Sequence, residues 1–449
     1  MSALFGDLPA TIVQRREPGG MPRLRVADRQ QVTWQPLALD DLLAPDHLAR
    51  AVLVFVCGLD LAPLRAAIRS CGARAGAPAT DPEILVALWL FAIISGVGSA
   101  RALARLCEEH VAYRWLCGGV GMNAHTLSDF RVDHEAWLDG VFTTSIAALL
   151  EGEVISLAQV AQDGLRVRAA AGAGSFRRGE SLQENLEAAR QQVETLKAEL
   201  RAAPAAGNSR SRAAQQRAAR ERQQRVEAAL AALPEAEERL RRNGGAKKPD
   251  KKTGKPQPAR VSTTDAEAHV MKMPDGGFRP AYNIQFAAET EHGFIVGVAA
   301  SDSGADQPSL EPMVEQVITR TGRTPRQWLM DGGFVKGQSI TTLRRDHGID
   351  VYAPPMAGKG PRDAADPARH DTPELAEWRA RMATDAAKGI YRKRAATIEC
   401  ANAHARRRGL YSIPVRGRCK ARIIALWHAL AHNLMCGLRV AQCAAAQAA

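Results

Sequence analysis

The feature that most limits the possible folds is the order of the β-like runs along the chain. An apolar run, residues 154–162, ends at Asp163 and is followed by a long interruption. The next β-like runs, residues 281–288 and 294–300, flank the short turn Glu291-His292-Gly293. Two such runs joined by a short turn that contains glycine predict a β-hairpin.

Helical and β-like runs alternate after this hairpin. The pattern predicts a helix at residues 309–320, a strand that ends at Asp331, a helix at 339–346 and a strand at 350–353. Three antiparallel strands followed by helix, strand, helix and strand is the order of a ribonuclease H-like mixed-sheet α/β fold. We expect this catalytic domain to follow an all-α domain, because residues 46–150 have helical patterns throughout.

The long interruption between the first two strands has the pattern of two helices. Apolar residues from Leu182 to Leu200 alternate in steps of four and three, and this spacing returns in residues 226–240. We expect an inserted coiled-coil hairpin, with a bend or a new helix start at Pro234. The predicted organisation is an amino-terminal extension (1–45), a helical domain (46–150), the first part of the catalytic domain (151–180), the hairpin (181–242), a basic flexible linker (243–260) and the second part of the catalytic domain with carboxy-terminal helices (261–449).

Three acidic residues belong to these elements. Asp163 and Asp331 are expected at two strand ends, and Glu399 lies in a strongly basic helix. Carboxylates that converge from two strands and a helix can hold a pair of Mg²⁺ ions, which is the chemistry of phosphodiester cleavage. Two simpler interpretations remain open: Asp331 ends a strand in a turn, and Glu399 pairs with Arg392 or Arg406.

Other acids compete for the third position. Glu374, Glu377 and Asp385 precede the basic helix, and we rank them lower because Gly389 separates them from it. Asp302 and Asp306 are expected to cap or turn the chain.

The segment Asp331-Gly332-Gly333-Phe334 forms one motif, and Tyr391, Arg394, Glu399 and Arg406 form a second. They resemble the second-aspartate motif and the Tyr-Arg-Glu-Lys signature of bacterial insertion-sequence transposases of the DDE type. Arg394 and Glu399 are one residue further apart than in the commonest signature, and Arg406 stands in place of the Lys. The resemblance implies that Asp163, Asp331 and Glu399 are catalytic and bind two Mg²⁺ ions, with Mn²⁺ able to substitute, and that Tyr391, Arg392, Arg394 and Arg406 bind DNA.

The reaction that this resemblance implies is cleavage at the ends of a mobile element and joining of its 3′-hydroxyl ends to target DNA. The implied partners are the terminal inverted repeats, the target DNA and a second copy of the chain in the DNA complex. Helices joined by glycine turns permit a helix-turn-helix in the amino-terminal region. Its candidates for recognising element ends are Arg101, Arg105, Arg114 and Arg131.

Three alternatives stay open. The helical region could serve dimerisation or packing instead of DNA recognition. The chain could be a catalytically decayed DNA-binding protein of the same fold, or a ribonuclease H-like nuclease.

Composition limits the setting of this chain. A net charge of +12 suits an acidic partner such as nucleic acid. The eight cysteines include no Cys-x₂-Cys pair, which argues against a zinc ribbon and for a reducing compartment. The longest apolar run, residues 84–97, is too short to span a bilayer comfortably and predicts a buried helix. We therefore expect a cytoplasmic, nucleoid-associated protein without a membrane segment.

Overall fold

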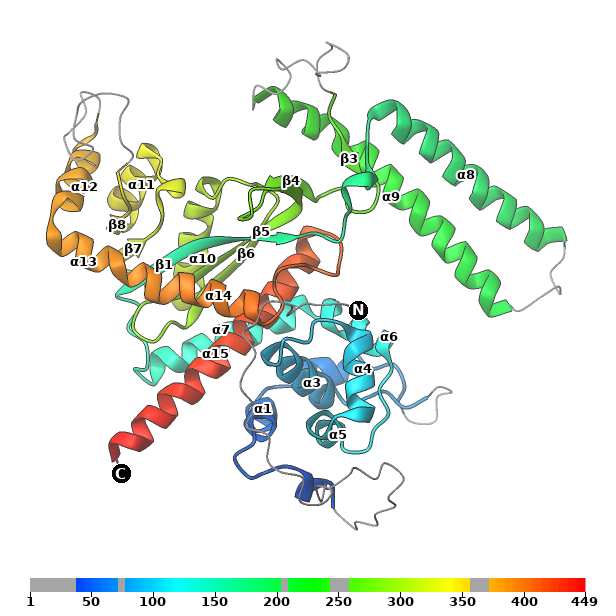
Figure 1. Ribbon diagram of the computed structural model, residues 1–449, viewed down its shortest axis with the longest axis horizontal. Coiled ribbons are helices and arrows are strands. Elements are labelled where there is room, and N and C mark those ends of the chain that lie inside the picture. Colours follow the sequence, from blue (N-terminus) through cyan, green and yellow to red (C-terminus); the bar gives the residue numbers. More distant parts are fainter. Residues whose placement is uncertain (1–37, 72–76, 203–208, 243–257, 356–370, 449) are drawn as a thin grey trace, which may run out of the picture.

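The protein is a mixed α/β structure in which helices surround one mixed β-sheet (Figure 1). This is a computed structural model, and it describes residues 38–71, 77–202, 209–242, 258–355 and 371–448. The expected α/β class is confirmed. Most of the predicted extension 1–45 and of the predicted basic linker 243–260 lies outside the described residues.

In residues 38–71 and 77–158, seven α-helices come before the first strand. The Asp81 side chain caps α3 by accepting the Glu83 N–H, and Pro82 occupies the first turn of that helix. Residues 85–93 of α3 are all buried, so the prediction of a core helix in this apolar run is confirmed. The seven are α1 (Leu48–Cys57), α2 (Ala62–Ala66), α3 (Pro82–Ile94), α4 (Ala100–Glu109), α5 (Val111–Cys117), α6 (Ala124–Asp133) and α7 (Glu135–Glu151).

The sheet is mixed, with β1 (Gln159–Arg168) near its centre. On one side β1 pairs antiparallel with β5 (Phe278–Glu289), which pairs with both β4 (His269–Lys272) and β6 (Ile295–Ser301). On the other side β1 runs parallel to β7 (Gln327–Leu329), which runs parallel to β8 (Asp350–Tyr352). The predicted hairpin of β5 and β6 and the two later strands are therefore confirmed, whereas β4 was not foreseen.

Helices cover the sheet and extend the chain beyond it. The predicted helices after the hairpin are present as α10 (Leu310–Thr321) and α11 (Gly337–His347). The segment that follows β8 contains α12 (Pro373–Ala383), α13 (Asp385–Arg394), a π-helix (Ala395–Glu399), α14 (Cys400–Arg407) and α15 (Arg418–Ala448). In Figure 1, α13 and α14 cross in front of β1.

Among the described residues, α15 alone is long and apolar enough to cross a membrane. Two thirds of its most apolar stretch is buried inside the protein, where it packs against β6 and α3. This burial is typical of the core helix of a globular domain.

The segment between β1 and β5 contains the two helices α8 (Gly179–Ala202) and α9 (Ser209–Arg242). They lie side by side and project from the body of the protein (Figure 1). Leu182 of α8 and Ala229 of α9 are buried in the contact between them. The helix α9 continues through Pro234, so the expectation of a new helix start there is wrong. Two short strands, β2 (Phe176–Arg177) and β3 (Val261–Ser262), pair at the base of α8 and α9.

Candidate active site

Asp163 lies in the middle of β1, not at its end as the sequence analysis proposed. The strand continues because Leu165 and Val167 maintain the alternation of buried side chains after Asp163. Its carboxylate lies on the face of the sheet that α13 and α14 cover, since Arg394 and Asn402 of this segment contact it. Asp163 is therefore held on a rigid central strand.

Asp331 follows β7, the parallel neighbour of β1. Its side chain caps the 3₁₀-helix Gly332–Phe334 by accepting the Gly333 N–H at 2.7 Å. The turn interpretation is thus correct for this residue, and it does not exclude a functional role. The parallel register pairs Ala161 with Leu329, so Asp331, two residues past Leu329, follows beside Asp163, two residues past Ala161. Asp331 also contributes to the raised pKa of Asp163.

Glu399 is the last residue of the π-helix that joins α13 to α14. A π-helix pairs residues five apart, whereas an α-helix pairs residues four apart. Arg394 and Glu399 are five apart, and the Arg394 Nη1 lies 2.5 Å from the Glu399 Oε1. The π-helix therefore leaves both side chains on the same face, although they are five residues apart.

Arg394 links the two acids that come from the strand and the helix. Its Nη2 lies 3.2 Å from the Asp163 Oδ1, and its side chain is only 9% exposed. The predicted partners of Glu399, Arg392 and Arg406, are not the ones that the structure shows. In this conformation the guanidinium lies between Asp163 and Glu399 and supplies the positive charge of the site.

The electrostatics of the site reflect this burial. Burial raises the pKa of Asp163, Arg394 and the Gly164 N–H oppose the increase, and Asp331 adds to it. Burial by itself would lower the pKa of Arg394, but Asp163, Tyr391 and the other two acids raise it above its ordinary value. The pKa of the Tyr391 hydroxyl is also raised, first by burial and then by the same acids. Tyr391, Arg394 and the three acids thus form one electrostatic cluster.

Asn402 of α14 is a member of the site that the sequence analysis missed. Its Nδ2 donates to the Asp163 Oδ2 at 3.1 Å. The residue is buried, and its Oδ1 has no hydrogen-bond partner among the described residues. A single Asn within a helix carries no local signal, so only the tertiary contact identifies it.

The donor chemistry of this cluster fits a hard cation. Three carboxylates and the unpartnered Oδ1 of Asn402 are oxygen ligands of the kind that Mg²⁺ takes. In the described part of the chain, no group of three or more His, Cys, Asp or Glu side chains is already arranged around a metal position. Arg394 fills the space between two of the acids, so binding of a cation by both of them requires its guanidinium to move.

The competing acids are engaged elsewhere. Glu374 and Glu377 of α12 pair with Arg345 and Arg344 of α11. Asp385 begins α13 and pairs with Lys388 of the same helix. Gly389 lies inside α13, so the reason given for ranking these acids lower is wrong, although they lie outside the cluster.

The predicted DNA-binding residues differ in their exposure. Arg392 and Arg406 are exposed, Tyr391 is half-buried and Arg394 is buried. In the amino-terminal helices, Arg101, Arg105 and Arg114 are exposed.

Arg131 is buried, and it donates to the Gly98 carbonyl at 2.5 Å while its guanidinium lies over the Trp89 ring. Burial lowers its pKa to about 10. The expectation that Arg131 recognises element ends is therefore wrong, because its side chain is buried and packs inside the helical region.

Asp306 begins the 3₁₀-helix Gln307–Ser309, so it turns the chain as expected, although its side chain makes no cap hydrogen bond. The side chain belongs instead to a polar cluster on the opposite face of β1. Asp306 accepts hydrogen bonds from Asn283 at 2.6 Å and from Gln285 at 2.8 Å. A Cβ atom at Gly164 would collide with Asp306 and would come within 2.5 Å of the Gln285 Nε2. Glycine is required here because polar side chains approach the strand backbone closely.

Comparison with known proteins bears on the amino-terminal helices. No curated protein and no solved structure matches the chain. Residues 37–133, which contain α1 to α6, match the family model described as Transposase domain (DUF772). This match supports a transposase role for the protein. Transposases are in general enzymes.

Proposed function

We propose that the protein is a DNA transposase of the DDE type, and that its sheet is the core of a ribonuclease H-like catalytic domain. The observation that carries the proposal is that Arg394 contacts both Asp163 and Glu399, while the register of β1 and β7 brings Asp331 beside Asp163. The strand order β6-β5-β1-β7-β8, with only β5 antiparallel to β1 among the direct neighbours of β1, supports the fold assignment. The family match of residues 37–133 supports the transposase role independently.

In this proposal Asp163, Asp331 and Glu399 hold two Mg²⁺ ions, and Mn²⁺ can substitute. Ions held by these residues would supply charge to activate the attacking oxygen and stabilise the leaving oxygen of a phosphodiester. Asn402 keeps the Asp163 carboxylate oriented through its Nδ2. Arg394 exchanges its carboxylate partners for a DNA phosphate, to which its planar fork is suited.

The exposed Arg392 and Arg406 and the half-buried Tyr391 bind the DNA backbone. The partners in this proposal are the terminal inverted repeats and the target DNA, bound by a homodimer in the cytoplasm at the nucleoid. The net charge of +12 favours such a polyanionic partner.

Strand cleavage and joining test this proposal directly. Purified protein is incubated with DNA that carries the ends of its own element, with Mg²⁺ or Mn²⁺, for wild type and for Asp163→Asn, Asp331→Asn and Glu399→Gln. We expect wild type to nick and join the ends, and all three variants to bind DNA without either reaction. Asp385→Asn is the matched control, because it makes the same change on an exposed acid of α13 outside the cluster.

The outcomes separate the alternatives. Activity retained by Glu399→Gln alone would show that the third acid is wrong. Binding of the ends without cleavage by wild type would favour a decayed DNA-binding protein, and cleavage without any joining would favour a nuclease.

A further inference from the structure

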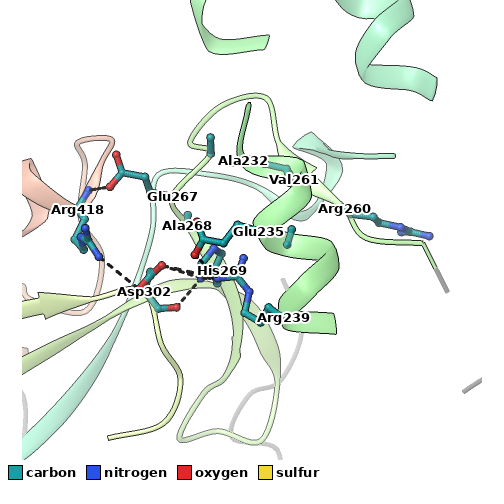
Figure 2. A pocket seen from close by; sticks show the side chains of 12 residues that line it. Ala232, Glu235, Arg239, Arg260, Val261, Glu267, Ala268, His269, Asp302 and Arg418 are labelled. Carbon is teal, nitrogen blue, oxygen red and sulfur yellow. Dashed lines mark hydrogen bonds and ion pairs between the residues drawn. The ribbon is translucent and has the colours of Figure 1, made fainter. Parts of the chain in front are cut away.

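The base of the projecting helices contains two cavities of similar size and different charge. The first, of about 210 Å³, lies between the end of α9, β4 and the start of α15. Figure 2 shows that Asp302 is central to it, with Arg418 and His269 directed toward its carboxylate. Arg239 also approaches Asp302, and Glu267 accepts the Arg418 N–H at 2.9 Å. Charges of both signs compensate one another here, so this cavity needs no ligand.

The second cavity, of about 230 Å³, has no such compensation. Its polar lining consists of arginines and neutral groups, and none of the described residues that line it is acidic. Four guanidinium groups gathered without a carboxylate repel one another, and an anion relieves that repulsion. The lining residues are Arg177, Asn185, Arg222, Arg225, Val226, Thr263, Thr264 and Arg416.

The behaviour of Arg225 agrees with this charge distribution. Its pKa is lowered by burial and then by Arg416, and Glu221 opposes the decrease from a distance of 3.8 Å. Arg222 donates to the neutral Gln192 side chain at 3.0 Å. These partners leave the positive charge of the cavity largely uncompensated.

The cavity joins parts of the chain that are distant in sequence. Arg177 comes from β2, Arg222 and Arg225 come from α9, and Arg416 comes from the loop that connects α14 to α15. This loop is fixed because the Gly417 N–H donates to Asp265, a buried residue that also accepts the Tyr282 hydroxyl. The loop that carries Arg416 is therefore held in place by hydrogen bonds to a buried residue.

We propose that this cavity, the arginine pocket, binds a backbone phosphate of the DNA substrate. Arginine forks match phosphate oxygens, and the Thr263 and Thr264 hydroxyls are further possible donors. The proposal rests on the proposed function, because it takes DNA as the polyanion. A continuous DNA strand suits the pocket better than a free phosphate does, since Arg177, Arg222 and Arg416 are exposed.

The arginine pocket is separate from the candidate active site. β1 extends five residues past Asp163 to Arg168, which is about 17 Å, and the base of α8 and α9 lies beyond that end in Figure 1. A phosphate bound there is several nucleotides from the reacting one. The pocket thus positions DNA along the protein and has no part in the bond chemistry.

Fluorescence anisotropy with a short duplex that carries an element end tests this inference at several salt concentrations. The full chain is compared with the double variant Arg225→Gln/Arg416→Gln and with Arg225→Lys/Arg416→Lys, which keeps both charges. Arg323→Gln is the control, because this exposed arginine precedes β7 at the opposite end of β1. A series of duplexes with one neutral methylphosphonate at successive positions locates the phosphate.

We expect the double glutamine variant to bind more weakly, with a log–log salt slope less steep by about one for each phosphate that it no longer neutralises. The lysine variant should recover most of the affinity, and the control should match wild type. One methylphosphonate position should weaken wild type but leave the double glutamine variant unaffected.

Equal affinity and equal salt slope for wild type and the double glutamine variant would overturn the inference. The inference would also be overturned if inorganic phosphate bound to wild type but not to the double glutamine variant, while no methylphosphonate position showed an effect that depends on the two arginines. Cleavage by wild type in the same samples reports on the proposed function separately. Binding that depends on the pocket without cleavage would reject the transposase and retain the pocket.

Discussion

The link that Arg394 forms between Asp163 and Glu399 makes the substitution Arg394→Met a sharp test of the site. Methionine matches the unbranched stem of arginine and carries no charge, so the packing of the stem is kept while both ion pairs are removed. Asp163 keeps its hydrogen bonds from the Gly164 N–H and the Asn402 Nδ2. Glu399 is half exposed, so breaking its ion pair should lower the free energy of unfolding by about 1 kcal/mol or less.

Most of the decrease in the free energy of unfolding comes from Asp163, which is left buried without a cation. This decrease has an upper limit, because the variant can protonate the Asp163 carboxyl instead of keeping it charged. Protonating an ordinary Asp costs roughly 4 kcal/mol at pH 7 and about 1.5 kcal/mol at pH 5. The raised pKa of Asp163 in the wild type brings the decrease below this upper limit. We expect a decrease in the free energy of unfolding of about 2–4 kcal/mol at pH 7, most of which disappears at pH 5.

Urea unfolding without divalent ions, at both pH values, measures this difference. Arg392→Met is the control, since Arg392 is exposed on the same helix and should change stability by less than about 0.5 kcal/mol. With Mg²⁺ at one hundred times its dissociation constant, the Arg394→Met protein should gain about 2.7 kcal/mol. Wild type should gain less, because its guanidinium competes with the ion. A loss that is absent, or that is the same at pH 5 and pH 7, would refute the ion-pair reasoning.

Three further predictions follow from named contacts. Gly164→Ala should destabilise the protein by about 3 kcal/mol, because the new Cβ meets Asp306 and Gln285. Its control is Gly140→Ala on α7, whose Cβ meets nothing within 4 Å and which should stabilise the protein by up to about 1 kcal/mol. Thermal melts of both variants measure these changes. Asn402→Leu should reduce strand cleavage by about 10–100-fold and move the acid limb of the pH–rate profile upward, since Asp163 loses the Nδ2 donor. Asp163 has a raised pKa in the folded state, so its contribution to stability is present below the ordinary Asp value and is lost as pH rises through the raised value. Asp163→Asn, which does not titrate, should therefore become more stable relative to wild type across that window in urea unfolding.

The elements that the sequence predicted well are those with local signals. The β5–β6 hairpin has two apolar runs around a glycine turn, and α3 has a cap, a proline in its first turn and a continuous apolar run. The three acids were selected from local motifs, although what brought them together had to come from the strand order.

Most of the features that the sequence did not predict depend on tertiary packing. The alternation of Leu165 and Val167 indicates that β1 continues past Asp163, although the apolar run before Asp163 is the stronger local signal. The π-helix has no local signature, and neither does the contact of Asn402 with Asp163. α9 tolerates Pro234 because the neighbouring Leu230, Leu233 and Ala236 pack against the α8–α9 core.

The candidate site also depends on the helices that precede it in sequence. Residues from α1 to α7, from the sheet and from α10 to α15 form one continuous hydrophobic core. α15 contacts both the amino-terminal helices and the sheet. Trp427 donates to the Arg131 carbonyl at the end of α6, and the Asn433 amide pairs with both backbone groups of Ile295 in β6. α14, which carries Asn402, packs against α15 and is joined to it by residues 408–417, so the position of α15 contributes to the position of Asn402 against Asp163. The segment that matches the transposase family model is therefore part of the framework that orients the first catalytic acid of the proposed mechanism.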